Sequence, residues 1–186
     1  MSTRAPAHRT PWVATSIGVL ALLACLTIGR NAPEQALLSY LFTFLFFTGL
    51  SIGSLALLMV HALTGGAWGS WLRQPLLAAA RTLPLQAVLL IPILMGMHWL
   101  YPWARAPALQ QDALLRAQAW YLNTTFFVCR SVLYFILWLA LLAAVGARHH
   151  PGRDGLPRIA AIGLIVYALS TLLASTDWAM SLMPHW

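Results

Sequence analysis

The fold of this chain is indicated most clearly by the segment YLNTTFFVCRSVLYFILWLALLAAVGA, residues 121–147. From residue 122 to residue 147 it is long and apolar enough to cross a bilayer as a helix, which needs about 20 residues. One side chain breaks the pattern, because Arg130 carries a charge among these apolar residues. A charge within a membrane span is energetically costly and usually has a function.

The composition of the whole chain is that of an integral membrane protein. Its 186 residues are 60% hydrophobic and only 8% charged, and its mean hydropathy is +0.75, values far from those of a soluble domain. The net charge of +7 is spread thinly over the loops, so no basic run indicates nucleic-acid binding. Cys25 and Cys129 are isolated and lack the paired spacing of a zinc, iron–sulfur or covalent haem site.

Four further apolar segments accompany residues 122–147, and together they predict an all-α, polytopic membrane helix bundle. We expect one domain, residues 1–186, with about five transmembrane helices over residues 12–28, 35–63, 82–101, 122–147 and 158–178. The apolar runs are continuous rather than alternating, which argues against a β-barrel. The first run is long enough to span the bilayer, and no cleavage site and soluble domain follow it, so we interpret it as a span and not as a secretory signal.

Arginine counts on the two sides of these spans predict the orientation. Seven arginines fall on the side of the N-terminal tail and three on the opposite side. Because cytoplasmic flanks carry the excess of positive charge, we expect a cytoplasmic N-terminus in the inner membrane of a bacterium. An aromatic belt is then expected at the outer interface, formed by Trp99, Tyr101, Trp103, Trp120 and Tyr121.

A second charge, Asp177, lies in the last predicted span. Arg130 is ten residues beyond Trp120 on a helix that enters from outside, which places it roughly 10 to 15 Å below that interface. Asp177 is nineteen residues beyond Arg158, and about 28 Å of rise brings it near the same outer surface. We therefore predict that the two charges pair in the outer leaflet. The alternative is that Asp177 caps its helix at the water interface while Arg130 extends to lipid headgroups.

Each of these charges belongs to a polar stripe on its own helix. Ser170 and Asp177 are seven residues apart, which places them on one face. Arg130, Tyr134 and Trp138 share a face at spacings of four residues. We expect the two stripes to face each other and to line a protonatable site between the fourth and fifth spans.

Two histidines are further candidates for a proton path. His98 lies near the outer end of the third span, in the layer of the charged pair, and His61 lies near the cytoplasmic end of the second span. Two axial ligands of one haem would have to be level, so we do not expect a haem within this chain. His61 is either a helix-end residue near the interface or a site of proton entry.

Several stretches occur in the order seen in one known family. They are GSLALLMVHALTGGAWG (53–69), RTLPLQAVLLIPIL (81–94), LYPWA (100–104), YLNTTFFVCRSVLYFILW (121–138) and STDWAMSLMPHW (175–186). They resemble the ActF membrane subunits of alternative complex III, a bacterial quinol:cytochrome c (or other acceptor) oxidoreductase, whose fold is NrfD-like. The resemblance covers nearly all of this chain but only the first half of the family's ten-span subunit. Met183 stands where the family usually has an acidic residue.

The resemblance implies a non-catalytic subunit that contributes to proton conduction and assembly and carries no cofactor of its own. Haem c and iron–sulfur clusters are then expected in a multihaem cytochrome c and an iron–sulfur partner subunit, and quinol in a neighbouring NrfD-like subunit. A terminal oxidase is a further candidate partner, and membrane lipid surrounds the spans. The proton-path candidates, taken from the matching motifs and from position, are Asp177, Arg130, His61, His98, His185, Tyr134 and Ser170.

Two other functions remain open on the sequence. The chain could be a structural membrane scaffold whose polar residues only join helices. It could also be part of a secondary transporter, in which Arg130 and Asp177 bind a substrate near the outer leaflet. An internal inverted repeat would favour transport, and none is evident in the sequence.

Overall fold

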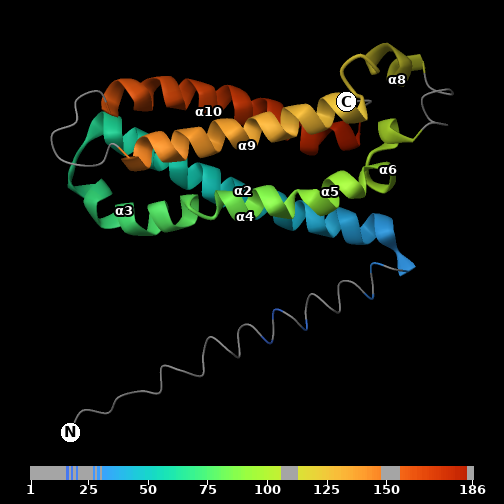
Figure 1. Cartoon of the computed structure of the whole chain (residues 1–186), viewed down its shortest axis with the longest axis horizontal. Helices are drawn as coiled ribbons and strands as arrows, with labels where there is room; N and C mark the ends of the chain where they lie inside the picture. Colours follow the sequence, from blue (N-terminus) through green and yellow to red (C-terminus); the bar gives the residue numbers. More distant parts are fainter. Residues whose placement is uncertain are drawn as a thin grey trace, which may run out of the picture.

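The structure, a computed structural model, describes residues 31–105, 113–147 and 156–183 and a few isolated positions before residue 31 (Figure 1). Within these residues the chain is helical and contains no strand, which confirms the all-α prediction. The elements are α2 (Pro33–Thr64), α3 (Ala67–Ala80), α4 (Leu83–Leu89), α5 (Ile91–Met95), α6 (Met97–Leu100), η1 (Pro102–Ala104), α8 (Ala113–Gln118), α9 (Thr124–Ala147), α10 (Leu156–Trp178) and η2 (Met180–Leu182).

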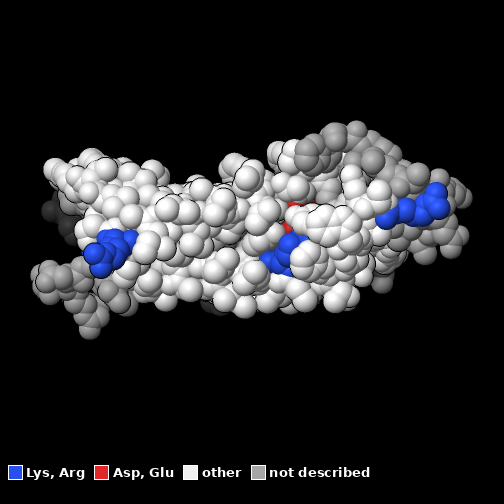
Figure 2. Space-filling view, turned by 90° about the horizontal axis from the view of Figure 1, so that it is seen from above, with Lys and Arg blue, Asp and Glu red and all other residues white. Residues whose placement is uncertain are grey.

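Four stretches of the described chain are long and apolar enough to cross a membrane. They are Pro33–Thr64, Trp71–Met95, Thr124–Gly146 and Leu156–Leu182, and they correspond to the last four of the five predicted spans. The first predicted span, residues 12–28, lies almost entirely outside the described residues. Figure 2 shows one face of the bundle, on which basic side chains appear at separate places, an acidic side chain shows beside one of them, and the described surface between these places is uncharged. The chain is a multi-pass membrane protein.

The second of these spans begins earlier than the sequence predicts, at Trp71 instead of residue 82. The sequence predicts a connection over residues 68–81 that forms a short amphipathic helix along the interface. The structure has a helix there, α3, which includes Pro75. Short helices then follow one another along α2 (Figure 1). Pro84 and Pro92 occupy the first turns of α4 and α5, where the missing backbone N–H interrupts no helical hydrogen bond.

Helix α2 is the centre of the bundle and packs against α3, α4, α9 and α10. In Figure 1, α2 and α9 run from one end of the bundle to the other, and α4 and α10 run back. Gly163 of α10 permits close packing, since a Cβ there would lie 2.8 Å from the sulfur of Met59 and 3.0 Å from Leu141. The side chains that α2 buries recur every three or four residues, and they include Leu41, Phe44, Thr48, Ser51, Ile52, Leu55, Leu58 and Met59.

Candidate functional site

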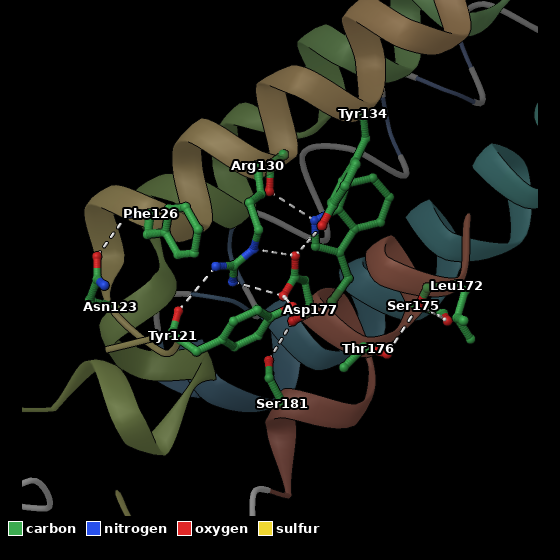
Figure 3. Close-up of polar contacts among 12 residues, drawn as sticks. Tyr121, Asn123, Phe126, Arg130, Tyr134, Leu172, Ser175, Thr176, Asp177 and Ser181 are labelled. Carbon is green, nitrogen blue, oxygen red and sulfur yellow. Dashed lines mark hydrogen bonds and ion pairs between the residues drawn. The ribbon is translucent and has the colours of Figure 1, made fainter. Parts of the chain in front are cut away.

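Arg130 and Asp177 form a buried, two-point ion pair between α9 and α10 (Figure 3). Arg130 Nε donates to Asp177 Oδ2 and Nη2 donates to Oδ1, each at 2.8 Å. Such paired bonds are the strong form of the arginine–carboxylate contact. Asp177 is 0% exposed and Arg130 is 8% exposed. The predicted pairing is therefore confirmed, and the alternative of a water-exposed cap and an arginine extended to lipid headgroups is wrong.

Two tyrosine hydroxyls complete the surroundings of the carboxylate. Tyr134 Oη donates to Asp177 Oδ2 at 2.6 Å, and Tyr121 Oη donates to Oδ1 at 3.0 Å. With the two bonds from Arg130, the carboxylate accepts four hydrogen bonds, which is about its full capacity. The Ser181 hydroxyl also donates to the backbone carbonyl of Asp177. We call Tyr121, Arg130, Tyr134 and Asp177 the Asp177 cluster.

The guanidinium of Arg130 is in contact with two aromatic rings, which are nearly perpendicular to each other. It lies 3.9 Å from the ring centre of Tyr121 and 4.3 Å from that of Phe126, so aromatic faces replace the water that a cation loses on burial. Its Nη1 donates to the Tyr121 carbonyl at 3.1 Å. The local sequence places Phe126, because Asn123 Oδ1 accepts from its backbone N–H at 2.8 Å and so caps the start of α9.

The cluster lies at one end of the bundle. Arg130 is six residues into α9, about 9 Å from its start, and Asp177 is one residue from the end of α10. Each charge alone in an apolar span would be strongly unfavourable, whereas together they form a neutral, fully hydrogen-bonded unit. The prediction that both charges occupy the same layer is confirmed by their contact.

The two predicted polar stripes do face each other. Tyr134 meets Asp177, and further into the bundle Trp138 Nε1 donates to Ser170 Oγ at 2.9 Å. Tyr134 and Trp138 stack with ring centres 6.3 Å apart. Ser170 therefore belongs to the same interface but not to the Asp177 cluster itself.

Two residues of the predicted aromatic belt are instead part of the core. Tyr101 is 0% exposed and Trp103 is 1% exposed, and their rings stack with centres 5.2 Å apart. Tyr101 Oη donates to the carbonyl of Trp178 at 3.0 Å. Residues 101–104 turn inward at η1 and pack under α9, which places these rings against Phe127. Trp120 is exposed, as a belt residue would be.

Sequence reasoning missed part of this site. The sequence predicts Tyr121 as part of the aromatic belt at the membrane interface. In the structure its hydroxyl, ring and carbonyl all contact the ion pair. Ser131 is not among the predicted site residues, although its Oγ accepts a hydrogen bond from Trp178 Nε1 at 3.0 Å. The one available signal was spacing, since Ser131 and Trp178 each follow a charged residue directly.

The histidine candidates do not join the cluster. His98 is exposed, with its ring 4.1 Å from that of Trp99. His61 lies toward the far end of α2, where its Nδ1 is 3.3 Å from the Gly65 carbonyl oxygen and its ring contacts Trp68. His185 lies outside the described residues. Within the described part of the chain, no three His, Cys, Asp or Glu side chains gather as a metal site would require.

Two tyrosines outside the spans have raised pKa values. Burial raises the pKa of Tyr121, and the negative charge and hydrogen bond of Asp177 raise it further, against an opposing effect of Arg130. Burial likewise raises the pKa of Tyr101, with a smaller contribution from Asp177. Both hydroxyls therefore stay protonated at neutral pH and act as hydrogen-bond donors.

Comparison with known proteins assigns no family, because no protein-family model matches the chain and no curated protein is significantly similar to it. The chemistry of the site is therefore inferred from its side chains and their hydrogen bonds. An ion pair with two hydroxyl donors can fasten helices to one another. Hydroxyl groups bonded to a carboxylate can also pass a proton between them.

Proposed function

We propose that this chain is a membrane subunit of a bacterial respiratory quinol:cytochrome c (or other acceptor) oxidoreductase, located in the inner membrane with a cytoplasmic N-terminus. In this role it supports assembly and proton conduction and carries no redox centre. Multihaem cytochrome c, iron–sulfur and quinol-binding NrfD-like subunits are its partners. The order of motifs in residues 53–186 supports this assignment, and the four membrane spans are consistent with it.

The observation that carries the proton role is the order of hydroxyl groups around Asp177. Tyr121, at the end of the bundle, bonds to one carboxylate oxygen, and Tyr134, four residues deeper than Arg130, bonds to the other. For a proton to cross the cluster, one tyrosine gives its proton to the carboxylate and regains one from its other side. The second tyrosine takes the proton from the carboxylate as it releases its own onward, while Arg130 compensates the negative charge. This makes the cluster suited to the outer mouth of a proton route.

The assembly role rests on the elements that the cluster joins. Arg130 connects α9 to Asp177 of α10, and its bond to the Tyr121 carbonyl fastens the segment before α9 to the same point. Less than half of the apolar window of each span in the described part of the chain is buried. The remaining apolar surface is available to lipid and to the helices of partner subunits.

Purification in a mild detergent tests the assignment. The tagged chain, extracted from membranes of its native cell, is expected to bring with it a multihaem cytochrome c, an iron–sulfur subunit and quinol-oxidising activity. A preparation that contains none of these proteins and no quinol-oxidising activity would contradict the respiratory assignment.

Proton translocation by the assembled complex in vesicles tests the role of the cluster. Asp177→Asn keeps the shape of the side chain but removes its charge and leaves Arg130 without its counter-charge, so we expect less assembled complex. In the complex that does assemble, proton translocation per electron transferred should be slower. The matched control is Glu34→Gln at the exposed ion pair with Arg105, which should leave translocation unchanged. Equal rates of proton translocation in the two variants would show that Asp177 has only a structural role.

A structural scaffold is the second candidate, and one observation favours it. The carboxylate of Asp177 already accepts four hydrogen bonds from Arg130, Tyr121 and Tyr134. A fully bonded group is well suited to fastening helices. The same saturation leaves no acceptor position for a substrate, so the geometry lends no support to the transporter alternative.

A further inference from the structure

Two buried polar side chains in the middle of the spans each have an oxygen atom without a hydrogen-bond partner among the described residues. Thr48 on α2 is 2% exposed and Gln86 on α4 is 5% exposed. The unpartnered atoms are Thr48 Oγ1 and Gln86 Oε1. Such atoms are strongly unfavourable in an apolar interior unless something bonds to them, and in a membrane span no bulk water is at hand.

Thr48 departs from the behaviour of other hydroxyl groups on its helix. Thr43, Ser51, Ser54 and Thr64 each donate to the carbonyl four residues earlier. This is the usual way in which a helix satisfies a buried hydroxyl. The Thr48 hydroxyl makes no such bond, so it is free to bond to a group outside α2.

A hydrogen bond between α2 and α4 sets the register of Thr48 against Gln86. Ser51 Oγ and Thr82 Oγ1 lie 2.7 Å apart, and the two helices run in opposite directions (Figure 1). Thr48 is three residues before Ser51 and Gln86 is four residues after Thr82, so both steps lead toward the same end of the bundle. The rises are about 4.5 and 6 Å, which leaves the two residues at levels about 1.5 Å apart.

We infer that Thr48 and Gln86 hold a buried water molecule between α2 and α4. The atom types are complementary, because the Thr48 hydroxyl can donate to a water and the water can donate to Gln86 Oε1, which only accepts. Buried waters characteristically bond polar groups that the protein leaves unpaired. The site is distinct from the Asp177 cluster and does not depend on the proposed function.

The water site lies close to the Asp177 cluster along α2. Phe44 packs against Trp178, the neighbour of Asp177, with ring centres 5.4 Å apart. Thr48 is one turn of α2 from Phe44, about 6 Å along the helix. If the chain conducts protons, the bound water lies about one helical turn from the level of Asp177 and supplies a hydrated step on the inner side of the cluster.

Radiolytic labelling of the intact protein in detergent tests the site without any mutation. Radiolysis of a bound water produces hydroxyl radicals beside it, which oxidise adjacent buried side chains. Leu83 and Leu90 lie within one turn of Gln86, and Leu58 is an equally buried leucine further along α2. We expect Leu83 and Leu90 to be labelled several-fold faster than Leu58. Equal, slow labelling of all three overturns the inference.

A double-mutant cycle with Gln86→Leu and Thr48→Val gives an independent test. If water bridges the two side chains, each single variant lowers the midpoint of thermal unfolding, and the double variant loses less than the sum of the two. Thr43→Val, at an exposed hydroxyl bonded to its own helix, is the matched control and should change little. Midpoints that rise in both single variants would show a dry interface and overturn the proposal. The respiratory assignment would be unaffected, since it is tested by co-purification.

Discussion

The Nε and Nη2 atoms of Arg130 each lie 2.8 Å from a different carboxylate oxygen of Asp177. No other charged side chain is buried in the part of the chain that the structure describes. The contact joins the second turn of α9 to the last turn of α10. Its effect on stability and its effect on proton movement are separable, because substitutions can remove one partner, both partners or only the hydroxyl donors.

Removal of Arg130 should destabilise the fold strongly. Arg130→Ala leaves the carboxylate of Asp177 buried without its counter-charge, at a cost of about 3–5 kcal/mol. Arg130→Lys should restore little, since an ammonium cannot form the two parallel bonds to the carboxylate or stack on an aromatic ring as a planar guanidinium does. The measurement is denaturant unfolding in detergent, followed by tryptophan fluorescence.

Glu34→Gln is the control for this prediction. Glu34 and Arg105 form an exposed ion pair at 3.5 Å, and such pairs contribute about 0–1 kcal/mol. If Arg130→Ala unfolds at the same denaturant concentration as Glu34→Gln, the buried pair is not a major source of stability.

Replacement of both charges should recover much of the loss. In Arg130→Met combined with Asp177→Leu, neither side chain carries a charge that must be removed from water, and buried ion pairs are often replaceable by apolar residues of similar volume. We expect the double variant to recover most of the roughly 3–5 kcal/mol that removal of one partner costs. The same variant should abolish the proton function proposed for Asp177. A double variant less stable than both single variants would contradict this account.

The two tyrosine donors should differ in their contributions. Tyr134→Phe removes a donor at 2.6 Å from a buried carboxylate, and hydrogen bonds to charged groups contribute about 1.5–3 kcal/mol. Tyr121 is partly exposed and its bond is 3.0 Å long, so Tyr121→Phe should cost less. Tyr121→Ala should cost more than Tyr121→Phe because it also removes the ring that covers Arg130. A reversed order in unfolding experiments would refute this ranking.

The contact between α2 and α3 depends on a glycine. A Cβ at Gly69 would collide with the ring of His61, so Gly69→Ala should lower the midpoint of thermal unfolding. His61→Ala should relieve the collision, and the double variant should therefore be more stable than Gly69→Ala alone. Gly49→Ala is the control, because a Cβ there meets nothing within 4 Å and helix propensity favours alanine by up to about 1 kcal/mol.

Stability should fall at alkaline pH. The folded protein raises the pKa of Tyr121 above its ordinary value of 10.0, so the folded state holds this proton more tightly than the unfolded state does. The contribution is fully present below pH 10.0 and is lost as the pH rises through the raised pKa. Unfolding midpoints measured against pH should decline less steeply in Tyr121→Phe. Equal slopes in the two proteins would show that other groups cause the decline.

Much of the architecture was predictable from the sequence, because a bilayer requires long apolar helices. The runs around residues 35–63, 122–147 and 158–178 correspond to helical spans in the structure. The span predicted to begin at residue 82 begins at Trp71, because the helix expected along the interface, α3, accommodates Pro75 and joins the apolar stretch that follows. Helical spacing also placed Arg130 and Tyr134 on one face and Asp177 and Ser170 on another, and these faces meet.

From the sequence alone it follows that Arg130 and Asp177 lie in apolar spans and need partners, because an isolated charge in hydrocarbon is too unfavourable to persist. The identity of those partners is visible only in the tertiary structure. Tyr121 and Tyr101 are aromatic residues beside a predicted interface, and nothing local shows whether such a ring faces lipid or protein. That choice depends on how residues 101–104 and 119–123 fold over the end of the bundle, where Tyr101 meets Trp178 and Tyr121 meets Asp177.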